Sequence, residues 1–343
     1  MKKHITIKDI AIKAKLAKGT VSMALNNDPR ISLETRQRVN KIAAEMNFYP
    51  NESAKSLASG KTGSIAFIAP RFTAPFISSI LAAVENKAFK TGKYIHGITP
   101  YSTGNIVAAK DELLRKMLYG RKADAVVLMT LRPNPDVVAE YNKRGIPLIL
   151  VENDVRGCSC ISVDNINGAY KAVNYLIKKY GRDVGIIVGE SDPPLGQDQH
   201  YISQDRLKGY KQALSENMIE FDKNKVQFVR QYSYEEGRDC LNNFAKKKVK
   251  LQSIFCAAGD VLAMGVIDQA KKDGTRIPEN LAVAGYDDIL AAKLLNPALT
   301  TVRQPFDEIG TMVYDMAISL IEGKTKEEKH VVIEPELIKR ETA

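Results

Sequence analysis

Cysteine and histidine are scarce in this sequence, and long apolar runs are missing. Its 343 residues hold four cysteines and four histidines, and cysteines this few and scattered make no disulfide framework. No stretch approaches the roughly 18 consecutive apolar residues of a membrane-spanning helix. The start, MKKHITIKD, continues with charged residues and not with the apolar core of a signal peptide. These absences predict a cytoplasmic protein.

The common catalytic and cofactor-binding motifs are also missing. The sequence contains no G-x-S-x-G, Walker A, H-E-x-x-H or G-x-G-x-x-G pattern, and no histidine neighbours a plausible Ser or Cys nucleophile in sequence. Cys158 and Cys160 lie two residues apart without a second pair or a nearby histidine in sequence, so we interpret the cysteines as reduced thiols. The prediction is a protein that is not an enzyme and has no cofactor or metal.

Positive charge is concentrated at the start of the chain. The formal net charge is +10. Residues 1–62 contain twelve Lys and Arg against five Asp and Glu, an excess of seven positive charges, which leaves +3 for the other 281 residues. A basic segment of this kind is typical of a module that binds a polyanion. A basic surface that serves only solubility is the alternative.

Three short helices are predicted before residue 48. The first starts at Thr6, an N-cap with Asp9 in a capping-box-like position. The second covers residues 19–25, and the third starts after Ser32, another N-cap. Apolar residues recur at helical spacing within them: Ile7, Ile10, Ala11, Ala14, Val21, Ala24, Leu25, Val39, Ile42, Ala43 and Met46. Three short helices with a tight turn between the first two are the helix-turn-helix plan.

The second helix has the properties of a DNA-recognition helix. A single helix fits the major groove, which is about 12 Å wide, while the first helix braces it. Lysine and small polar side chains lie opposite its apolar face and can reach phosphates or base edges. The DNA contacts predicted in this unit are Thr6, Lys18, Gly19, Thr20, Ser22, Met23, Asn26, Arg30, Ser32 and Thr35.

A short segment separates this unit from the rest of the chain. Residues 51–58, NESAKSLA, lie between Pro50 and Ser59-Gly60. They are long enough for one or two helical turns, which are not stable alone, so we expect them to fold only against a partner or DNA. The predicted divisions are a headpiece over 1–48, a hinge helix or linker over 49–62 and a core over 63–343.

Strand-like and helix-like segments alternate from about residue 63. Most strand candidates are continuous apolar runs, as in parallel strands buried on both faces. The pattern predicts a doubly wound α/β core of two similar lobes, with ligand loops at the carboxyl ends of the strands. The first lobe is assigned residues 63–163 and 294–323, and the second 164–293 and 324–343. The strand candidates are 64–69, 94–99, 125–130, 147–152, 160–164, 183–189, 225–230, 253–257, 281–286 and 301–304, with helical patterns such as 76–90 and 260–273 between them.

Taken in order, these motifs resemble those of the lactose-repressor/purine-repressor (LacI/GalR) family of bacterial transcription regulators. The pattern T-I-K-D-I-A…T-V-S…L-N…T-R…N-F-Y-P-N is similar to the family's headpiece, and N-x-x-A-x-x-L-A at 51–58 to its hinge helix. Further matches are D-V-L-A-M-G at 260–265, G-Y-D-D at 285–288 and P-A-L-T-T-V-R-Q-P at 297–305. The resemblance covers essentially the whole chain.

The resemblance implies a homodimer whose two headpieces enter successive major grooves of a palindromic operator. Paired hinge helices would insert Leu57 into the central minor groove, with Ala54 and Ala58 as further contacts, and such apolar wedges kink the duplex. A small effector between lobes similar to those of periplasmic sugar-binding proteins would change the DNA affinity. Three positions depart from the family: Lys15 stands for a turn glycine, Ala17 for a capping serine, and Met23 for an arginine or histidine.

The resemblance also implies a set of effector contacts in the core. Carboxylates and a guanidinium can hydrogen-bond vicinal hydroxyls, and aromatic faces can cover the C–H side of a sugar ring. These residue types favour a sugar or sugar derivative as the effector. A purine or a sugar phosphate is the alternative, and a binding protein without a DNA role is a further one. The predicted contacts are Phe76, Tyr101, Thr130, Asp164, Arg206, Tyr232, Asp260 and Asp287.

Several of these residues have a purely structural alternative. Phe76 could pack between helices, Arg206 could pair with a surface acid such as Asp205, and Asp287 could cap the following turn. Residues 190–205, ESDPPLGQDQHYISQD, contain two prolines and a glycine that exclude a regular element. They are either a surface insertion or a functional segment, a lid or a specificity loop.

Overall fold

The computed structural model describes residues 5–48, 61–94, 96–190, 201–325 and 327–343. The chain divides into two compact units, residues 1–62 and 63–343, and each has a hydrophobic core of its own. None of the helices in the described ranges combines the length and apolar character that a membrane span requires.

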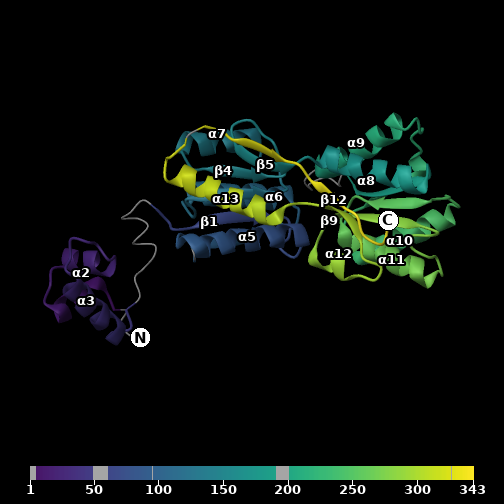
Figure 1. The fold of residues 1–343 in the computed structure, drawn as a ribbon. Helices are drawn as coiled ribbons and strands as arrows, with labels where there is room; N and C mark the ends of the chain where they lie inside the picture. The colour runs from purple at the N-terminus through teal and green to yellow at the C-terminus, as the bar shows by residue number, and fades with distance from the viewer. Residues whose placement is uncertain (1–4, 49–60, 95, 191–200, 326) are drawn as a thin grey trace. The chain divides into compact units, whose positions relative to one another are not determined.

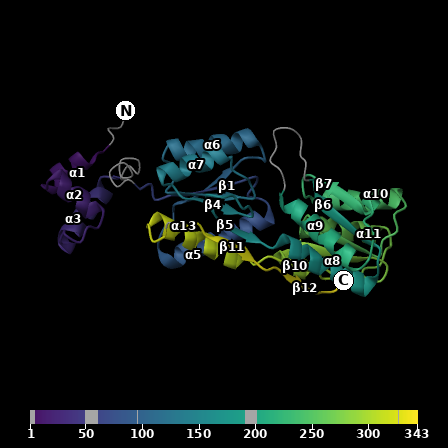
Figure 2. The same ribbon diagram turned by 90° about the horizontal axis from the view of Figure 1, so that it is seen from above.

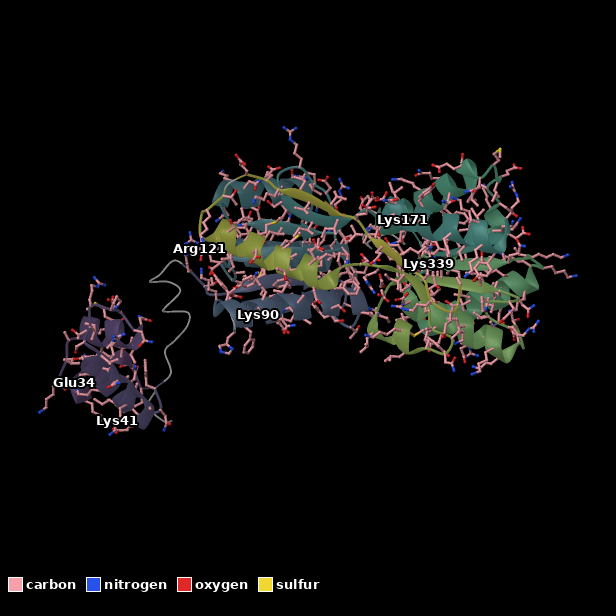
Figure 3. All side chains as sticks on the ribbon, in the orientation of Figure 1. Glu34, Lys41, Lys90, Arg121, Lys171 and Lys339 are labelled. Atoms are coloured by element: carbon pink, nitrogen blue, oxygen red, sulfur yellow. The ribbon has the colours of Figure 1, made fainter. Side chains whose placement is uncertain are left out.

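The described residues of the N-terminal unit form a bundle of three helices, α1 (Ile7–Ala14), α2 (Lys18–Leu25) and α3 (Leu33–Glu45). The Asp9 carboxylate accepts hydrogen bonds from the backbone N–H and the hydroxyl of Thr6, at 2.8 and 2.7 Å, and so fixes the start of α1. Glu34 and Lys41 on α3 are exposed to solvent (Figure 3). The predicted helix-turn-helix plan is confirmed. Its core consists of Ile10, Ala11, Ala14, Val21, Ala24, Val39 and Ala43.

Two of the departures from the family pattern have structural consequences. Lys15, which ends α1, adopts a left-handed backbone conformation with φ 52° and ψ 46°. This conformation costs a non-glycine residue roughly 1 kcal/mol. Ala17 stands at the N-cap of α2 and makes no side-chain cap hydrogen bond, so a stabilisation of about 1 kcal/mol from a capping hydroxyl is absent.

In the part of the core unit that the structure describes there are two six-stranded sheets, one in each lobe. The order is β11-β5-β4-β3-β1-β2 in the first lobe and β12-β10-β9-β8-β6-β7 in the second. The pairings are parallel except that between β10 and β12, which confirms the predicted doubly wound α/β core. The strands of the first lobe are β1 (Ile65–Ala69), β2 (Ile98–Ser102), β3 (Ala125–Met129), β4 (Leu148–Val151), β5 (Ser159–Val163) and β11 (His330–Ile333). Those of the second are β6 (Val184–Gly189), β7 (Val226–Val229), β8 (Ser253–Cys256), β9 (Ala282–Asp287), β10 (Thr300–Arg303) and β12 (Glu336–Ile338).

Helices cover both faces of each sheet (Figures 1 and 2). In the first lobe, α5 (Pro75–Thr91) and α13 (Phe306–Ile321) pack side by side on one face, with α6 (Val107–Tyr119) and α7 (Pro135–Arg144) on the other. In the second lobe, α8 (Asn165–Tyr180) and α9 (Tyr201–Glu216) cover one face, with α10 (Tyr234–Lys246) and α11 (Asp260–Lys272) on the other. The short helices are η1 (Lys223–Lys225) and α12 (Leu290–Leu294).

The lobe boundaries near the C-terminus differ from the prediction. Strand β10, assigned to the first lobe, pairs with β9 in the second, and β11, assigned to the second lobe, pairs with β5 in the first. The chain therefore returns to the first lobe after residue 303 and to the second after residue 333. Strand β11 was not predicted, although Val331, Val332 and Ile333 are three consecutive β-branched residues. It lies at the edge of the sheet, and only Ile333 of the strand is buried.

Strand β2 is also displaced from the predicted 94–99. Tyr94 has a positive φ of 56°, which is incompatible with a strand, and the strand runs from Ile98 to Ser102. The consequence is that the loop after β2, with Gly104 and Asn105, reaches the cavity described below.

Candidate effector site and DNA-binding face

A cavity of about 440 Å³ is lined by residues of both lobes. Most of these residues lie at or just beyond the carboxyl ends of the strands, where α/β folds bind their ligands. The volume is in the range of roughly 300–1,000 Å³ that is typical of small-molecule sites. Five of the predicted effector residues line it: Phe76, Thr130, Arg206, Tyr232 and Asp287.

Several lining residues adopt a left-handed backbone conformation. They are Thr130 (φ 57°), Glu152 (φ 63°), Tyr232 (φ 56°) and Asp287 (φ 112°), and each ends or follows a strand. Such conformations cost non-glycine residues about 1–3 kcal/mol each and cluster at functional sites. Their concentration around one cavity supports a ligand-binding role for it.

Arg206 lies on α9 and is fixed at the cavity by two hydrogen bonds. Its Nε donates to Asn165 Oδ1 at 2.8 Å and its Nη1 to the carbonyl of Ala257 at 2.7 Å. The surface pairing considered for it is wrong, because Asp205 pairs with Lys208 at 2.7 Å and Arg206 is only 8% exposed. The guanidinium is thus oriented before any ligand arrives.

Two carboxyl groups, the buried Glu152 and the half-buried Asp287, interact with this guanidinium. Glu152 accepts hydrogen bonds from the backbone N–H of Val163 at 2.8 Å and from Asn165 Nδ2 at 2.6 Å, so Asn165 bridges Glu152 and Arg206. Burial raises the pKa of Glu152 to about 7, although Arg206 opposes the shift. Burial also raises the pKa of Asp287 to about 6, again against Arg206.

Neither Glu152 nor Asn165 was predicted as a site residue. Glu152 directly follows the buried apolar strand β4, and Asn165 follows β5 by two residues. Polar residues at the carboxyl ends of two apolar runs were a signal that could have found them.

The two predicted aromatic residues take up different roles at the cavity. Phe76 lines it and also packs edge-on against Phe306, with ring centroids 5.8 Å apart, so its packing and ligand roles coexist. The Tyr232 hydroxyl lies 3.1 Å from Ser203 Oγ. A side chain at Gly189 would come within 1.9 Å of that hydroxyl, so the glycine makes room for the tyrosine.

The other predicted effector residues, Tyr101, Asp164 and Asp260, are not among the cavity-lining residues. Tyr101 packs against the apolar core beneath α6 and α7. Asp164 caps α8 by accepting the backbone N–H of Asn167 at 2.9 Å. Asp260 is 1% exposed, and its hydrogen-bond partners are residues of the core itself. Its carboxylate accepts from the Thr301 hydroxyl at 2.6 Å and from the Ile289 N–H at 2.9 Å.

The predicted recognition helix presents most of its polar side chains to the surface. Lys18, Gly19 and Asn26 are exposed, and Thr20, Ser22 and Met23 are half-buried. A Cβ built on Gly19 would meet nothing within 4 Å. Packing inside the headpiece therefore gives no reason for a glycine in α2.

Three other predicted DNA contacts, Arg30, Ser32 and Thr35, have interaction partners within the headpiece. Arg30 forms an ion pair with Asp28, with Nη2 2.6 Å from Oδ2. The Ser32 hydroxyl donates to the Thr35 hydroxyl at 2.9 Å and accepts the Thr35 N–H at 3.3 Å, which caps α3. The hinge residues Ala54, Leu57 and Ala58 lie outside the described residues.

Comparisons with known proteins agree with this arrangement. Residues 6–51 match the model of the bacterial regulatory proteins of the lacI family, and residues 173–343 match a periplasmic binding protein-like domain. The HTH-type transcriptional repressor PurR of Proteus mirabilis is 31% identical over 98% of this chain and 96% of its own. Among solved structures, the lac repressor dimer bound to operator and the anti-inducer ONPF has a TM-score of 0.83 at 22% identity, covering 99% of both chains.

A complex of the transcriptional regulator CelR with cellobiose has a TM-score of 0.71 at 24% identity, covering 99% of this chain and 100% of its own. The matched family and the relatives above are transcriptional regulators rather than enzymes. The protein is a DNA-binding transcription regulator with a small-molecule effector, and it belongs to the lacI family of bacterial regulatory proteins.

Proposed function

We propose that this regulator is a homodimeric, cytoplasmic repressor whose operator affinity is controlled by a sugar or sugar derivative. The observation that carries the proposal is the convergence of Arg206, Asp287 and Tyr232 on one cavity of about 440 Å³. The effector would bind there, and the exposed face of α2 would bind the operator.

The chemistry of the cavity suits a polyol. A guanidinium donates in a fixed fork and a carboxylate accepts, so vicinal hydroxyls can use both groups at once. The aromatic side chains of Phe76 and Tyr232 offer apolar surface for the C–H side of a ring. That CelR binds cellobiose is consistent with a carbohydrate in a core of this fold.

A sugar phosphate is the second candidate, because further arginines line the cavity. Arg230 donates to Glu190, whereas no ion pair of Arg71 occurs within the described residues. A lining arginine without a carboxylate partner is suited to hold a phosphate. Amide side chains, Asn153 and Gln231, also line the cavity and could serve a purine.

Operator selection from random duplex DNA with the full chain tests the proposal. The selected operator is then titrated in the presence of monosaccharides, disaccharides, sugar phosphates and purines. We expect selection of a palindromic site and a change of affinity with one carbohydrate. A response to purines alone would contradict the sugar assignment, and selection of an asymmetric site by a monomer would contradict the dimer.

A further inference from the structure

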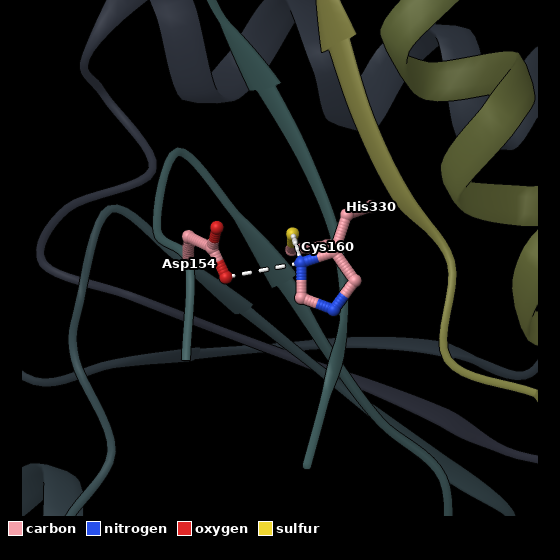
Figure 4. A group of neighbouring side chains, drawn as sticks. All are labelled: Asp154, Cys160 and His330. Atoms are coloured by element: carbon pink, nitrogen blue, oxygen red, sulfur yellow. Dashed lines mark hydrogen bonds and ion pairs between the residues drawn. The ribbon is translucent and has the colours of Figure 1, made fainter. Parts of the chain in front are cut away.

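The chain also carries a group of side chains outside the effector cavity that no part of the proposed function uses. Asp154, Cys160 and His330 each offer one ligand atom, and these atoms lie within 4.8 Å of one another (Figure 4). No histidine is near Cys160 in the sequence, because His330 lies 170 positions away. They meet because β11 pairs in parallel with β5, with His330 opposite Cys160 in the register.

The geometry argues against a catalytic relay. In a relay, the nucleophile uses one ring nitrogen of the histidine and the orienting carboxylate uses the other. Here Cys160 Sγ lies 3.2 Å and Asp154 Oδ1 3.0 Å from the same atom, Nδ1 of His330. A single proton on Nδ1 cannot be aligned with both partners, whereas a cation between the three atoms would satisfy all of them.

We propose that Asp154, Cys160 and His330 form a binding site for a divalent transition metal ion of the zinc type. Sulfur, imidazole nitrogen and carboxylate oxygen are the ligands that zinc takes in proteins. Zinc bonds of about 2.0–2.3 Å at tetrahedral angles hold such ligand atoms roughly 3.4–3.6 Å apart. The two separations from His330 Nδ1, 3.0 and 3.2 Å, need to open by only a few tenths of an ångström. The third, between Cys160 Sγ and the Asp154 carboxylate, is within 4.8 Å and would be set by rotation of the exposed Asp154 side chain.

The surroundings of the three ligands fit this role. Glu328 Oε2 lies 3.7 Å from Nε2, on the opposite side of the His330 ring, where a carboxylate commonly orients a metal-bound histidine. The same oxygen accepts the backbone N–H of Gly157 at 3.0 Å, so Glu328 is itself held. Cys160 is 2% exposed, whereas the Asp154 side chain is 70% exposed. The open side faces solvent and leaves room for water as a fourth ligand.

The site would join two strands and a loop close to the effector cavity. Cys160 and His330 lie on β5 and β11, and both strands lead directly into passages to the second lobe. Asp154 lies two residues beyond Glu152, which lines the cavity. A bound ion would therefore cross-link the first lobe beside the passages, and it should stabilise the core against unfolding.

Titration of the chelator-treated full chain with Zn²⁺ tests the site, followed by calorimetry and thermal unfolding. We expect one ion per chain and a higher unfolding temperature. Cys160→Ser and His330→Gln should each weaken binding at least tenfold, and Asp154→Asn should weaken it too. The matched controls Cys158→Ser and His96→Gln should bind as the parent does. Circular dichroism establishes that each variant is folded.

Titration with Co²⁺ identifies the sulfur ligand directly. A thiolate bound to Co²⁺ gives a ligand-to-metal absorption band, which we expect in the parent and in Cys158→Ser but not in Cys160→Ser. Stoichiometry well below one ion per chain, or equal binding by the parent, Cys160→Ser and His330→Gln, would overturn the proposal. The three residues would then form only a hydrogen-bonded cluster.

Discussion

The guanidinium carbon of Arg206 lies 3.5 Å from the centroid of the Tyr286 ring. Tyr286 is completely buried, and the planar guanidinium stacks on its ring. Stacking of this kind orients an arginine without consuming its donors. The Gly285-Tyr286-Asp287 motif thus supports one charged cavity residue and supplies another.

Replacement of Arg206 should weaken effector binding even when the charge is kept. Arg206→Ala is expected to reduce affinity more than tenfold, roughly 1.4 kcal/mol or more. Arg206→Lys should also bind weakly, because an ammonium neither stacks flat on Tyr286 nor donates in a fork. Calorimetry with the effector found in the panel measures both. Arg144→Lys is the matched control, since Arg144 stacks on Tyr119 at 4.6 Å and neither residue lines the cavity. Parent-like affinity in both Arg206 variants would remove Arg206 from the site.

Mutation of two aspartates of the core should affect different properties, stability for Asp260 and effector binding for Asp287. Asp260→Ala leaves the half-buried Ile289 N–H and the buried Thr301 hydroxyl without their acceptor. Each such loss costs about 1–3 kcal/mol of the free energy of unfolding. Asp287→Asn should instead weaken effector binding more than tenfold and change stability less. Urea unfolding and calorimetry on both variants separate the roles. A parent-like unfolding free energy for Asp260→Ala would contradict its structural assignment.

The motif around Asp287 illustrates what could be predicted from the sequence. The residue letters marked G-Y-D as a unit, but the separate roles depend on contacts between distant segments. A Cβ at Gly285 would lie 2.2 Å from Asp260 Oδ1. The close approach of a residue 25 positions earlier therefore requires glycine here. Asp260 and Asp287 are chemically identical, and only their burial and partners decide which one faces the cavity.

Apolar runs made the buried strands predictable, since their pattern is local. Strands β11 and β12 were not predicted, and the passages between the lobes follow no local pattern. The residues Val331, Val332 and Ile333 of β11 are a local strand signal, but the partner strand β5 lies about 170 residues away, so the pairing itself could not be predicted. Long-range pairing at a sheet edge therefore concealed the contact between Cys160 and His330.

Core stability should fall as the pH rises from about 4.5 to 7. The pKa of Glu152 is about 7 in the folded chain against an ordinary value of 4.5. Between these values the folded state binds more protons than the unfolded state, so unfolding becomes easier with rising pH. The shift corresponds to about 3 kcal/mol, and Asp287 acts in the same direction. Urea unfolding at pH 5 and pH 8 measures the effect.

Glu152→Gln is the variant that isolates this group. Because glutamine does not titrate, the difference in unfolding free energy between pH 5 and pH 8 should shrink by an amount of that order. Glu112→Gln, at an exposed position on α6, is the control and should keep the parent's pH dependence. An unchanged difference in Glu152→Gln would show that Glu152 is ionised in the folded chain throughout this range.

Restoring the two family residues in the helix-turn-helix should stabilise the headpiece. Lys15→Gly relieves a left-handed conformation, with a net gain of up to about 1 kcal/mol because glycine also loses more backbone entropy on folding. Ala17→Ser adds a cap, typically about 1 kcal/mol. Amide exchange in α1 and α2 measures local stability. Asn47→Gly, at another left-handed position (φ 50°), should gain less because asparagine tolerates that conformation. The prediction would be contradicted if amide exchange slowed in neither Lys15→Gly nor Ala17→Ser.

The strongest test of the recognition helix is a substitution that should improve folding and impair binding. Gly19 lies in α2, and a Cβ there would meet nothing within 4 Å. Alanine is favoured over glycine in the middle of a helix by roughly 0.5–1 kcal/mol. Gly19 is the second residue of α2, so Gly19→Ala should stabilise the headpiece by up to this amount. If the glycine permits close approach to DNA, the added methyl group should weaken operator binding severalfold.

Asn40→Ala, on the exposed side of α3, is the control. It should raise helix stability by up to about 0.7 kcal/mol without changing operator affinity. Headpiece unfolding and fluorescence anisotropy with the selected operator measure the two properties, and operator affinity that stayed constant in Gly19→Ala would place the DNA contact elsewhere.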